Sequence, residues 1–551
     1  MASRSTPNRL ARGVGTVARR FVAGTRQRTR IDTRSLAAFR IALGLLIVAD
    51  ILLRSRNRTL FYTDEGVVPI ELAIAAEPVA AYSPYAFVGS PGGVALLFGL
   101  TALVGVALAV GYYTRPVTVV ALVLVVSLDA RNPFVLSFAD VLFATLLAFA
   151  VFLPLGERWS VDAVASDRPR RTSVASVASA LVLTQLVVMY VVNGYHKTTS
   201  ELWRSGEAAV LVLGIDEITF LFGDALRAAP ELLQLGGFVW LVMLCLAWLL
   251  LVLRDRPRHL FVAAFVIAHL SMAFTVRIGA FSYVCLAGLT LFLAPSAWDD
   301  GHRLLDRIGR RTAAWGVPVA RIGTGLDDGR RRAVATARPL PRPRLPRPGL
   351  LARLPFDPPV VSTRRNAFFG AVIVAGVVLG VAASLSAVGV VDEGTPQAEV
   401  EAGANALVEF QTDWSIFAPH PRTVDRYYVF PAVTTDGEVI DVHGDRPMTY
   451  DRPYDELQRQ HDTYRERFYM ASLPGDEGVP VADHLAAHLC ATYEFDDGGQ
   501  LTHVNMYLVE ERITRETIDD PTGRERSEHL LSRHACTEGE SPRDIAPPGN
   551  G

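Results

Sequence analysis

Lysine is almost absent from this chain of 551 residues: of its 54 basic residues, 53 are arginine and only one, Lys197, is lysine. Charged residues make up 20% of the sequence, against about 25% in a typical soluble protein, and apolar residues make up half. This balance excludes a simple soluble enzyme and indicates long segments that lie out of water. The scarcity of lysine and an acidic C-terminal segment also indicate a halophilic microbial source, because concentrated salt screens repulsion between like charges.

Cysteine is also scarce, and its four residues separate into two pairs. Cys245 and Cys285 lie in apolar runs, where a buried free thiol is the usual state. Cys490 and Cys536 lie in the acidic C-terminal segment, and we expect them to form a disulfide in an oxidising compartment. No CxxC pair or zinc-ligand spacing occurs, so we expect no metal site.

Long apolar runs occupy much of the chain. Nine of them are long enough, or nearly so, to cross about 30 Å of hydrocarbon. They are residues 34–53, 93–112, 116–130, 134–154, 174–194, 235–253, 259–276, 279–296 and 366–390. A tenth run, 207–223, is interrupted by Gly214, Asp216 and Glu217, which favours a buried half-helix or re-entrant segment. The sequence therefore predicts a mainly α-helical, polytopic transmembrane bundle with about nine spans and one half-helix.

Basic residues give this predicted bundle an orientation. Residues 1–30 carry eight arginines and no acidic residue, whereas residues 391–551 carry 32 acidic residues against 13 arginines. By the positive-inside rule, we expect the N-terminus in the cytoplasm and the C-terminal domain outside the cell membrane. The expected domains are a basic arm (1–30), a transmembrane domain (31–298), an Arg/Pro-rich cytoplasmic linker (299–365), a final transmembrane helix (366–390) and an acidic extracytoplasmic domain (391–551).

The C-terminal segment has the pattern of a small α+β domain. Residues 426–442 and 491–513 each alternate around a central Asp-Gly pair, which is typical of a β-hairpin with a two-residue turn. Between them, apolar residues of 454–470 recur at helical spacing. We therefore expect two hairpins joined by a helix.

Ionisable side chains within or beside the apolar runs are functional candidates, because a charge in hydrocarbon is costly. Arg40 and Asp50 lie close enough to the membrane surfaces for structural roles. Asp140 and His269 lie deeper, and a contact between helices fits them as well as a contact with substrate. Lys197 follows the fifth run by three residues. A desolvated lysine can lose its proton, whereas arginine cannot. The choice of lysine at this position therefore favours a role as a proton-accepting base over a role as an anchor at the membrane interface.

Five motifs follow one another along about residues 31–298. They are FRI (39–41), YTDEGVVP (62–69), RWSVDAV (158–164), GYHKTTSELWRSGEA (194–208) and the stretch from His269 through IGAFSYV (278–284) to Trp298. Together they resemble the vitamin K-dependent gamma-carboxylase family and its microbial relatives with a horizontally transferred transmembrane (HTTM) domain. The resemblance implies that Lys197 is the base that deprotonates a reduced quinone, with Asn132 and His269 in the quinone site. We count Asp140 and His196 among the substrate-binding candidates as well.

The chain departs from the carboxylases at Pro133, where they carry histidine, and their outer domain has no match in residues 391–551. The leading hypothesis is therefore a membrane oxidoreductase or carboxylase-like enzyme that acts on menaquinol or another lipid quinone. Its expected partners are membrane lipids and an extracytoplasmic protein partner or substrate, without nucleic acid. A non-enzymatic scaffold or lipid-binding protein is the first alternative. A transporter is the second, because a broken helix near Gly214 accompanies intramembrane charges.

Overall fold

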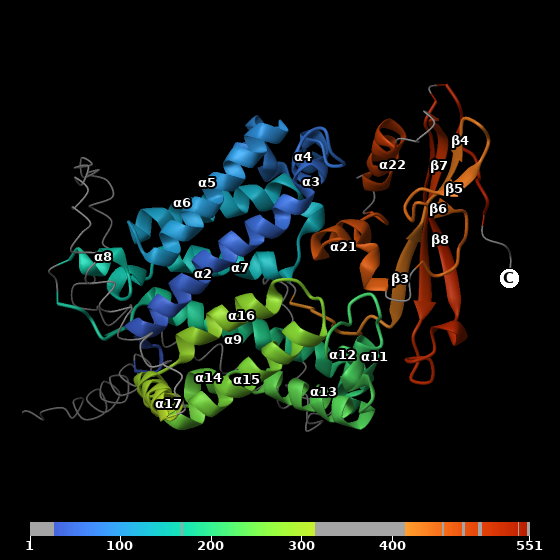
Figure 1. Ribbon diagram of the computed structural model, residues 1–551. Coiled ribbons are helices and arrows are strands. Elements are labelled where there is room, and N and C mark those ends of the chain that lie inside the picture. Colours follow the sequence, from blue (N-terminus) through green and yellow to red (C-terminus); the bar gives the residue numbers. More distant parts are fainter. Residues whose placement is uncertain are drawn as a thin grey trace, which may run out of the picture.

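The computed structural model describes residues 27–166, 169–314, 414–453, 457–475, 480–493, 499–537 and 539–547. Within these ranges, a bundle of helices is followed by a domain with a β-sheet, and the two meet at one end of the bundle (Figure 1). The described residues confirm the mainly helical class, with several apolar helices and a small C-terminal sheet. The predicted final helix (366–390) and nearly all of the basic arm (1–30) lie outside the described residues.

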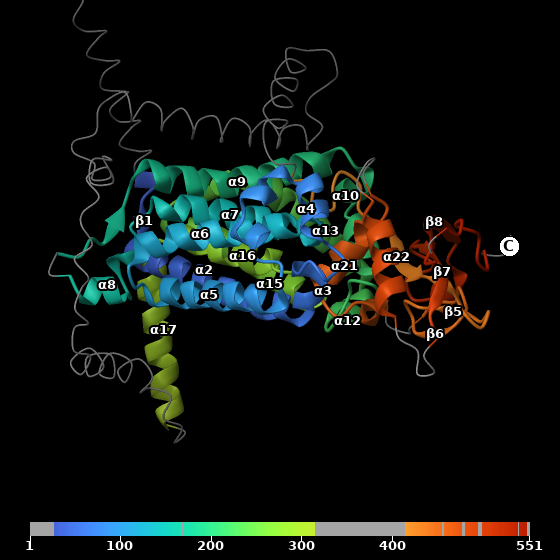
Figure 2. The ribbon, with the colours of Figure 1, turned by 90° about the horizontal axis from the view of Figure 1, so that it is seen from above.

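The main helices of the bundle run roughly alongside one another (Figure 2). They are α2 (Thr33–Arg54), α5 (Pro91–Val110), α6 (Thr114–Arg131), α7 (Phe138–Val151), α9 (Val177–Thr198), α13 (Pro230–Cys245), α14 (Leu249–Val252), α15 (Asp255–Thr275) and α16 (Phe281–Leu289). Each predicted apolar run up to residue 296 falls on one of these helices or on the α13–α14 pair. The hydrophobic pattern therefore located the helices of the bundle.

Fewer of these helices than predicted qualify as membrane spans. By length and composition, four described helices could cross a membrane, or five if α16 and α17 (Pro295–Ala314), bent by 106° near Leu293, count as one span. Helices α7 and α13 have 14 and 16 residues, and at 1.5 Å per residue neither reaches across about 30 Å. The expected nine spans are thus not reached among the described residues.

Short elements connect the main helices. They are β1 (Ile31–Asp32), η1 (Ser55–Asn57), α3 (Arg58–Tyr62), α4 (Ile70–Ala76), η2 (Pro78–Tyr82), η3 (Pro84–Phe87), η4 (Pro133–Val135), η5 (Leu155–Glu157), α8 (Val161–Val164), β2 (Ser173–Val174), α10 (Glu201–Ser205), α11 (Glu207–Leu213), α12 (Gly223–Arg227) and η6 (Thr290–Phe292). The predicted half-helix at 207–223 consists of the seven-residue α11, a turn and the start of α12. Helix α17 covers the first residues of the predicted linker (299–365), so that segment begins as a helix.

Local sequence explains where key helices begin and how closely they pack. Ser137 and Asp140 form a capping box at the start of α7, which satisfies backbone N–H groups that have no partner in the first turn. Helices α2 and α5 meet at Gly44 and Gly105, where a Cβ on Gly44 would lie 2.5 Å from the Gly105 oxygen. Small residues here allow the two backbones to approach closely, as in many membrane helix pairs.

The C-terminal domain is built around one long strand. Its strands are β3 (Val424–Val429), β4 (Pro431–Thr434), β5 (Val439–Asp441), β6 (Arg446–Pro447), β7 (Leu501–Arg512) and β8 (Arg526–Ala535). All neighbours are antiparallel, in the order β3-β7-β4-β5-β6, and β8 also pairs with β7. The helical elements η7 (Leu457–Gln460), α21 (Tyr464–Ala471), α22 (Val481–Thr492) and η8 (Pro521–Gly523) complete the domain. Helices α21 and α22 lie on the side of the sheet that faces the bundle (Figure 1).

The first predicted hairpin forms and the second does not. Strands β4 and β5 pair on either side of Asp436 and Gly437, as the alternation in 426–442 predicts. The prediction for 491–513 is wrong, because its first residues end helix α22 and its strand β7 pairs with β3, β4 and β8. Strand β7 is buried along most of its length, and it pairs with β3 and β4, which precede it in the chain, and with β8, which follows it.

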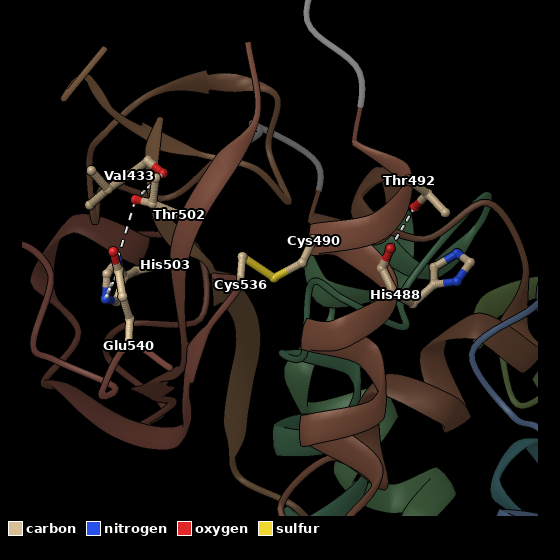
Figure 3. The surroundings of a disulfide bond; sticks show 8 residues. All are labelled: Val433, His488, Cys490, Thr492, Thr502, His503, Cys536 and Glu540. Atoms are coloured by element: carbon tan, nitrogen blue, oxygen red, sulfur yellow. Dashed lines mark hydrogen bonds and ion pairs between the residues drawn. A yellow bond between two sulfur atoms is a disulfide. The ribbon is translucent and has the colours of Figure 1, made fainter. Parts of the chain in front are cut away.

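A disulfide joins Cys490 of α22 to Cys536, just beyond β8 (Figure 3). The two sulfur atoms are 2.04 Å apart, and 46 positions separate the residues in sequence. The bond links the helix that faces the bundle to the sheet. Cys245 and Cys285 are buried thiols that form no disulfide within the described residues, as their apolar surroundings predict.

Candidate functional site

Lys197 lies in the last turn of α9, at the end of the bundle that faces the C-terminal domain, and only 2% of it is exposed. Its Nζ donates hydrogen bonds to the backbone oxygens of Ile416, at 2.6 Å, and Phe417, at 2.9 Å. The same nitrogen lies 3.8 Å from the centre of the Trp203 ring. Within the described residues, no carboxylate comes within ion-pair distance of Nζ. Lys197 is therefore a buried amine without a counter-charge in the part of the chain that the structure describes.

Residues 414–417, here called the strap, hold this arrangement from the C-terminal side of the chain. Asn193, one helical turn before Lys197, donates from Nδ2 to the oxygens of Trp414, at 2.6 Å, and Ile416, at 3.1 Å. The Trp203 Nε1 donates to the Phe417 oxygen at 2.7 Å. Three side chains of the bundle thus bind the carbonyl groups of a segment more than 200 residues away in sequence.

A cavity of about 590 Å³, here called the first cavity, adjoins Lys197. Its walls come from α9, α13, α15 and the strap, and apolar side chains predominate among them. Leu232, Val239 and Ile267 belong to its lining, and 45–67% of each is exposed on the outside of the bundle. The cavity therefore opens sideways, between α13 and α15, toward the surface that hydrocarbon would cover. Such a site suits an apolar, lipid-soluble molecule that presents a polar group to Lys197.

His269 lies behind the wall of the first cavity. Its Nε2 is 2.8 Å from the Tyr190 hydroxyl, and its ring packs beside those of Trp240 and Phe281. Tyr190, Trp240 and Phe281 line the cavity, whereas His269 itself does not. His196 precedes Lys197 on α9, is partly buried and contacts the ring of Tyr195, also outside the lining.

The two remaining substrate-binding candidates lie away from Lys197. Asn132 ends α6, where its Nδ2 donates to the Phe61 oxygen at 2.9 Å and its Oδ1 accepts the Phe134 N–H at 3.1 Å. It is fully buried and caps the turn that follows. Asp140 accepts the Ser137 N–H in the capping box of α7 and also binds arginines. The structure thus does not bring Asn132 or Asp140 to the first cavity.

Asp140 belongs instead to a buried network of arginine and aspartate. Arg465, from α21, binds Asp50 at 2.5 Å and Asp140 at 2.8 Å. Arg54, from α2, binds Asp50 at 2.7 Å, Asp129 at 2.6 Å and Asp140 at 3.2 Å. The C-terminal domain thereby inserts one cation into a cluster of carboxylates in the bundle.

A second polar contact docks the sheet onto the bundle. Asp425 of β3 accepts the N–H groups of Asp216 and Glu217 at 3.1 and 3.0 Å, and Arg524 binds it at 2.5 Å. Asp216 also binds Arg452 at 2.7 Å. This contact explains why acidic residues interrupt the apolar run at 207–223, since they are the docking point of the C-terminal domain.

Sequence reasoning missed the strap, Asn193 and Arg465 as parts of these sites. Asn193 carried a signal, because it is a polar residue one turn before Lys197 in an apolar helix. The strap lies within DWSIFAPHP (413–421), whose aromatic residues stand out, but nothing local indicates that its carbonyl groups face a lysine. Arg465 is one of several arginines in its segment, so no local signal separates it from the others.

Residues 28–298 match the family model of the HTTM domain. No curated protein and no solved structure matches the chain. The match supports the HTTM family for this part of the chain, and with the apolar helices it indicates a membrane protein. It includes Lys197, Asn193 and the walls of the first cavity from α9, α13 and α15, and it ends before the strap and the sheet domain.

Proposed function

We propose that this protein is a membrane enzyme that acts on a lipid quinol such as menaquinol, with Lys197 as the base. The observation that carries the proposal is a buried amine, with no counter-charge among the described residues, beside an apolar cavity that opens sideways. A lipid quinol would enter from the hydrocarbon, with its tail between α13 and α15 and its ring hydroxyl near Nζ. The carboxylase resemblance of the motif around Lys197 points to the same chemistry.

The contacts of Lys197 suit a neutral amine. Its two N–H bonds are directed to the oxygens of Ile416 and Phe417, which leaves the lone pair free to accept a proton. The quinol O–H bond would break and a third N–H bond would form, which gives a quinolate anion and an ammonium group. The Trp203 ring, 3.8 Å away, would stabilise that ammonium through a cation–π interaction. An electron acceptor such as dioxygen would then oxidise the quinolate.

Other groups around the first cavity would support this step. Tyr190, held by His269, offers a hydroxyl on the same wall as Lys197. Asn193 fixes the strap, so that the carbonyl groups keep Nζ in place. We place the protein in the cell membrane with the C-terminal domain outside, where an oxidising environment would allow the Cys490–Cys536 disulfide.

One alternative function rests on a specific observation. The strap accepts hydrogen bonds from Lys197, Asn193 and Trp203, so the lysine also serves to attach the C-terminal domain. A scaffold or lipid-binding protein would need only that attachment. Arginine could replace lysine in an attachment, whereas it could not act as a base.

The decisive experiment measures quinol-dependent oxygen consumption in membranes with wild-type protein, Lys197→Arg and Lys197→Ala. If Lys197 is the base, we expect both variants to insert and fold but to lose about 100-fold or more of the turnover. Arg204→Gln, an exposed change on the neighbouring α10, serves as the matched control and should keep wild-type turnover. Equal turnover in wild type and both Lys197 variants would remove the enzymatic proposal and favour the scaffold. Mass spectrometry of copurified lipids adds a second measurement, in which a bound quinone supports the enzyme.

A further inference from the structure

The bundle contains a second cavity, of about 490 Å³, between α2, α7, α16 and α21. It shares only Val276 with the lining of the first cavity, so the two lie on opposite sides of the segment that joins α15 to α16. Leu45, Leu53 and Tyr283 line it, and 38–58% of each is exposed on the outside of the bundle. The second cavity therefore also opens toward the surface that hydrocarbon would cover.

Two polar atoms on the wall of the second cavity have no hydrogen-bond partner within the described residues. They are the Tyr464 hydroxyl and the Arg465 Nε, both buried. A buried donor without an acceptor costs about 1–3 kcal/mol, so an acceptor from outside the described residues would stabilise both groups. Burial raises the pKa of Tyr464, and its hydroxyl therefore remains a donor at neutral pH. The Tyr464 ring packs on Gly279, where a Cβ would lie 2.7 Å from the ring and where a φ of +68° disfavours any side chain.

Two of the arginines that line the second cavity lie outside the buried arginine–aspartate network. Four arginines and three aspartates line it: Arg54, Arg56, Arg277, Arg465, Asp50, Asp140 and Asp462. Asp50 and Asp140 are bound by Arg54 and Arg465. Arg56 is exposed and has no ion pair within the described residues, and Arg277 uses its Nη1 for the Gln458 oxygen. Arg54 also binds Asp129, so the positive charge that an anion could meet comes from Arg56 and Arg277 and not from a net excess of arginine.

We propose that the second cavity binds an anionic phospholipid from the membrane leaflet next to the C-terminal domain. Its acyl chain would lie along Leu45, Leu53 and Tyr283, and its phosphate oxygens would accept hydrogen bonds from Tyr464 and Arg465. Arg56 and Arg277 would supply positive charge near the headgroup. Because α21 comes from the C-terminal domain, the bound lipid would contact both parts of the protein. This site does not depend on quinol chemistry in the first cavity.

The test uses full-length protein in detergent and measures the binding of phosphatidylglycerol by native mass spectrometry, with phosphatidylcholine as the zwitterionic comparison. We expect phosphatidylglycerol to bind at least fivefold more tightly. Tyr464→Phe deletes only the unpartnered hydroxyl, and Arg56→Gln removes an exposed charge, so both variants should fold. Each should weaken phosphatidylglycerol binding by about fivefold to tenfold. Tyr82→Phe and Arg204→Gln, which change exposed residues outside the second cavity, should bind as wild type does.

Three results would overturn the proposal. Equal binding of the two phospholipids would exclude recognition of an anion. Wild-type affinity in both Tyr464→Phe and Arg56→Gln would place the lipid elsewhere. Displacement of phosphatidylglycerol by millimolar inorganic phosphate would show that the site recognises a free anion without the tail. Quinol turnover is a separate readout, so failure of the lysine proposal leaves this test intact.

Discussion

Lys197 and Arg465 are both buried cationic side chains at the junction of the bundle and the C-terminal domain, yet their surroundings are opposite. Arg465 binds two carboxylates within 2.8 Å. Lys197 contacts two backbone oxygens and a tryptophan ring, with no carboxylate in range among the described residues. A buried charge with counter-charges can persist, whereas an amine without one is stable when it loses its proton. The difference separates a structural cation from a candidate base.

The largest effect should follow from removing the structural cation. Arg465→Leu leaves Asp50 and Asp140 with less positive charge in a buried site, and we expect a loss of about 3–5 kcal/mol in the free energy of unfolding or domain docking. Chemical unfolding in detergent and limited proteolysis between the two parts measure it. Arg515→Leu, which breaks the partly exposed ion pair with Glu207, should cost less than about 1 kcal/mol. Similar losses in the two variants would contradict a structural role for the network.

A buried histidine at the same junction extends the comparison to pH. His461 has no hydrogen-bond partner for either ring nitrogen within the described residues. Burial lowers its pKa, and His443, Arg467, Arg277 and Arg422 lower it further. Below about pH 6.5 the unfolded chain therefore binds a proton that the folded chain does not, so stability should fall as the pH falls, by about 1.4 kcal/mol per pH unit.

Unfolding measured at pH 7 and pH 5.5 checks this expectation. His461→Leu should reduce the loss of stability between these two pH values by about 1–2 kcal/mol. The exposed Ser541 provides the control, since Ser541→Leu removes no titratable group and should leave the pH dependence as in wild type. A wild-type pH dependence in His461→Leu would show that other groups cause it.

The smallest effect on stability should come from Lys197 itself. Lys197→Met removes an amine that has no counter-charge within the described ranges, and both backbone oxygens keep another donor, from Asn193 to Ile416 and from Trp203 to Phe417. We therefore expect the free energy of unfolding to change by less than about 1.5 kcal/mol. A loss as large as that of Arg465→Leu, measured by the same unfolding experiment, would mean that Lys197 is chiefly an attachment for the strap.

The sequence predicted helices and strands better than it predicted the contacts between distant residues. The run at 174–194 predicts α9, and the alternation in 426–442 predicts the β4–β5 hairpin, because both signals are local and periodic. The hairpin predicted at 491–513 failed because residues beside a turn signal can belong to a helix when the following strand finds its partners elsewhere. The carboxylase resemblance implied that Asn132 lies in the quinone site, but its side chain caps a turn away from Lys197.

By itself, the sequence determined the helical bundle, the separate C-terminal domain and the isolation of one lysine among arginines. Hydrophobic periodicity predicts a helix because the signal is contained in a few helical turns, and composition distinguishes an apolar segment from a polar one. Only the tertiary structure decided that Lys197 meets the strap, that Arg465 meets Asp50 and Asp140, and that two cavities open sideways. These contacts join residues more than 200 positions apart, and such pairings depend on how whole elements pack, which no local pattern records.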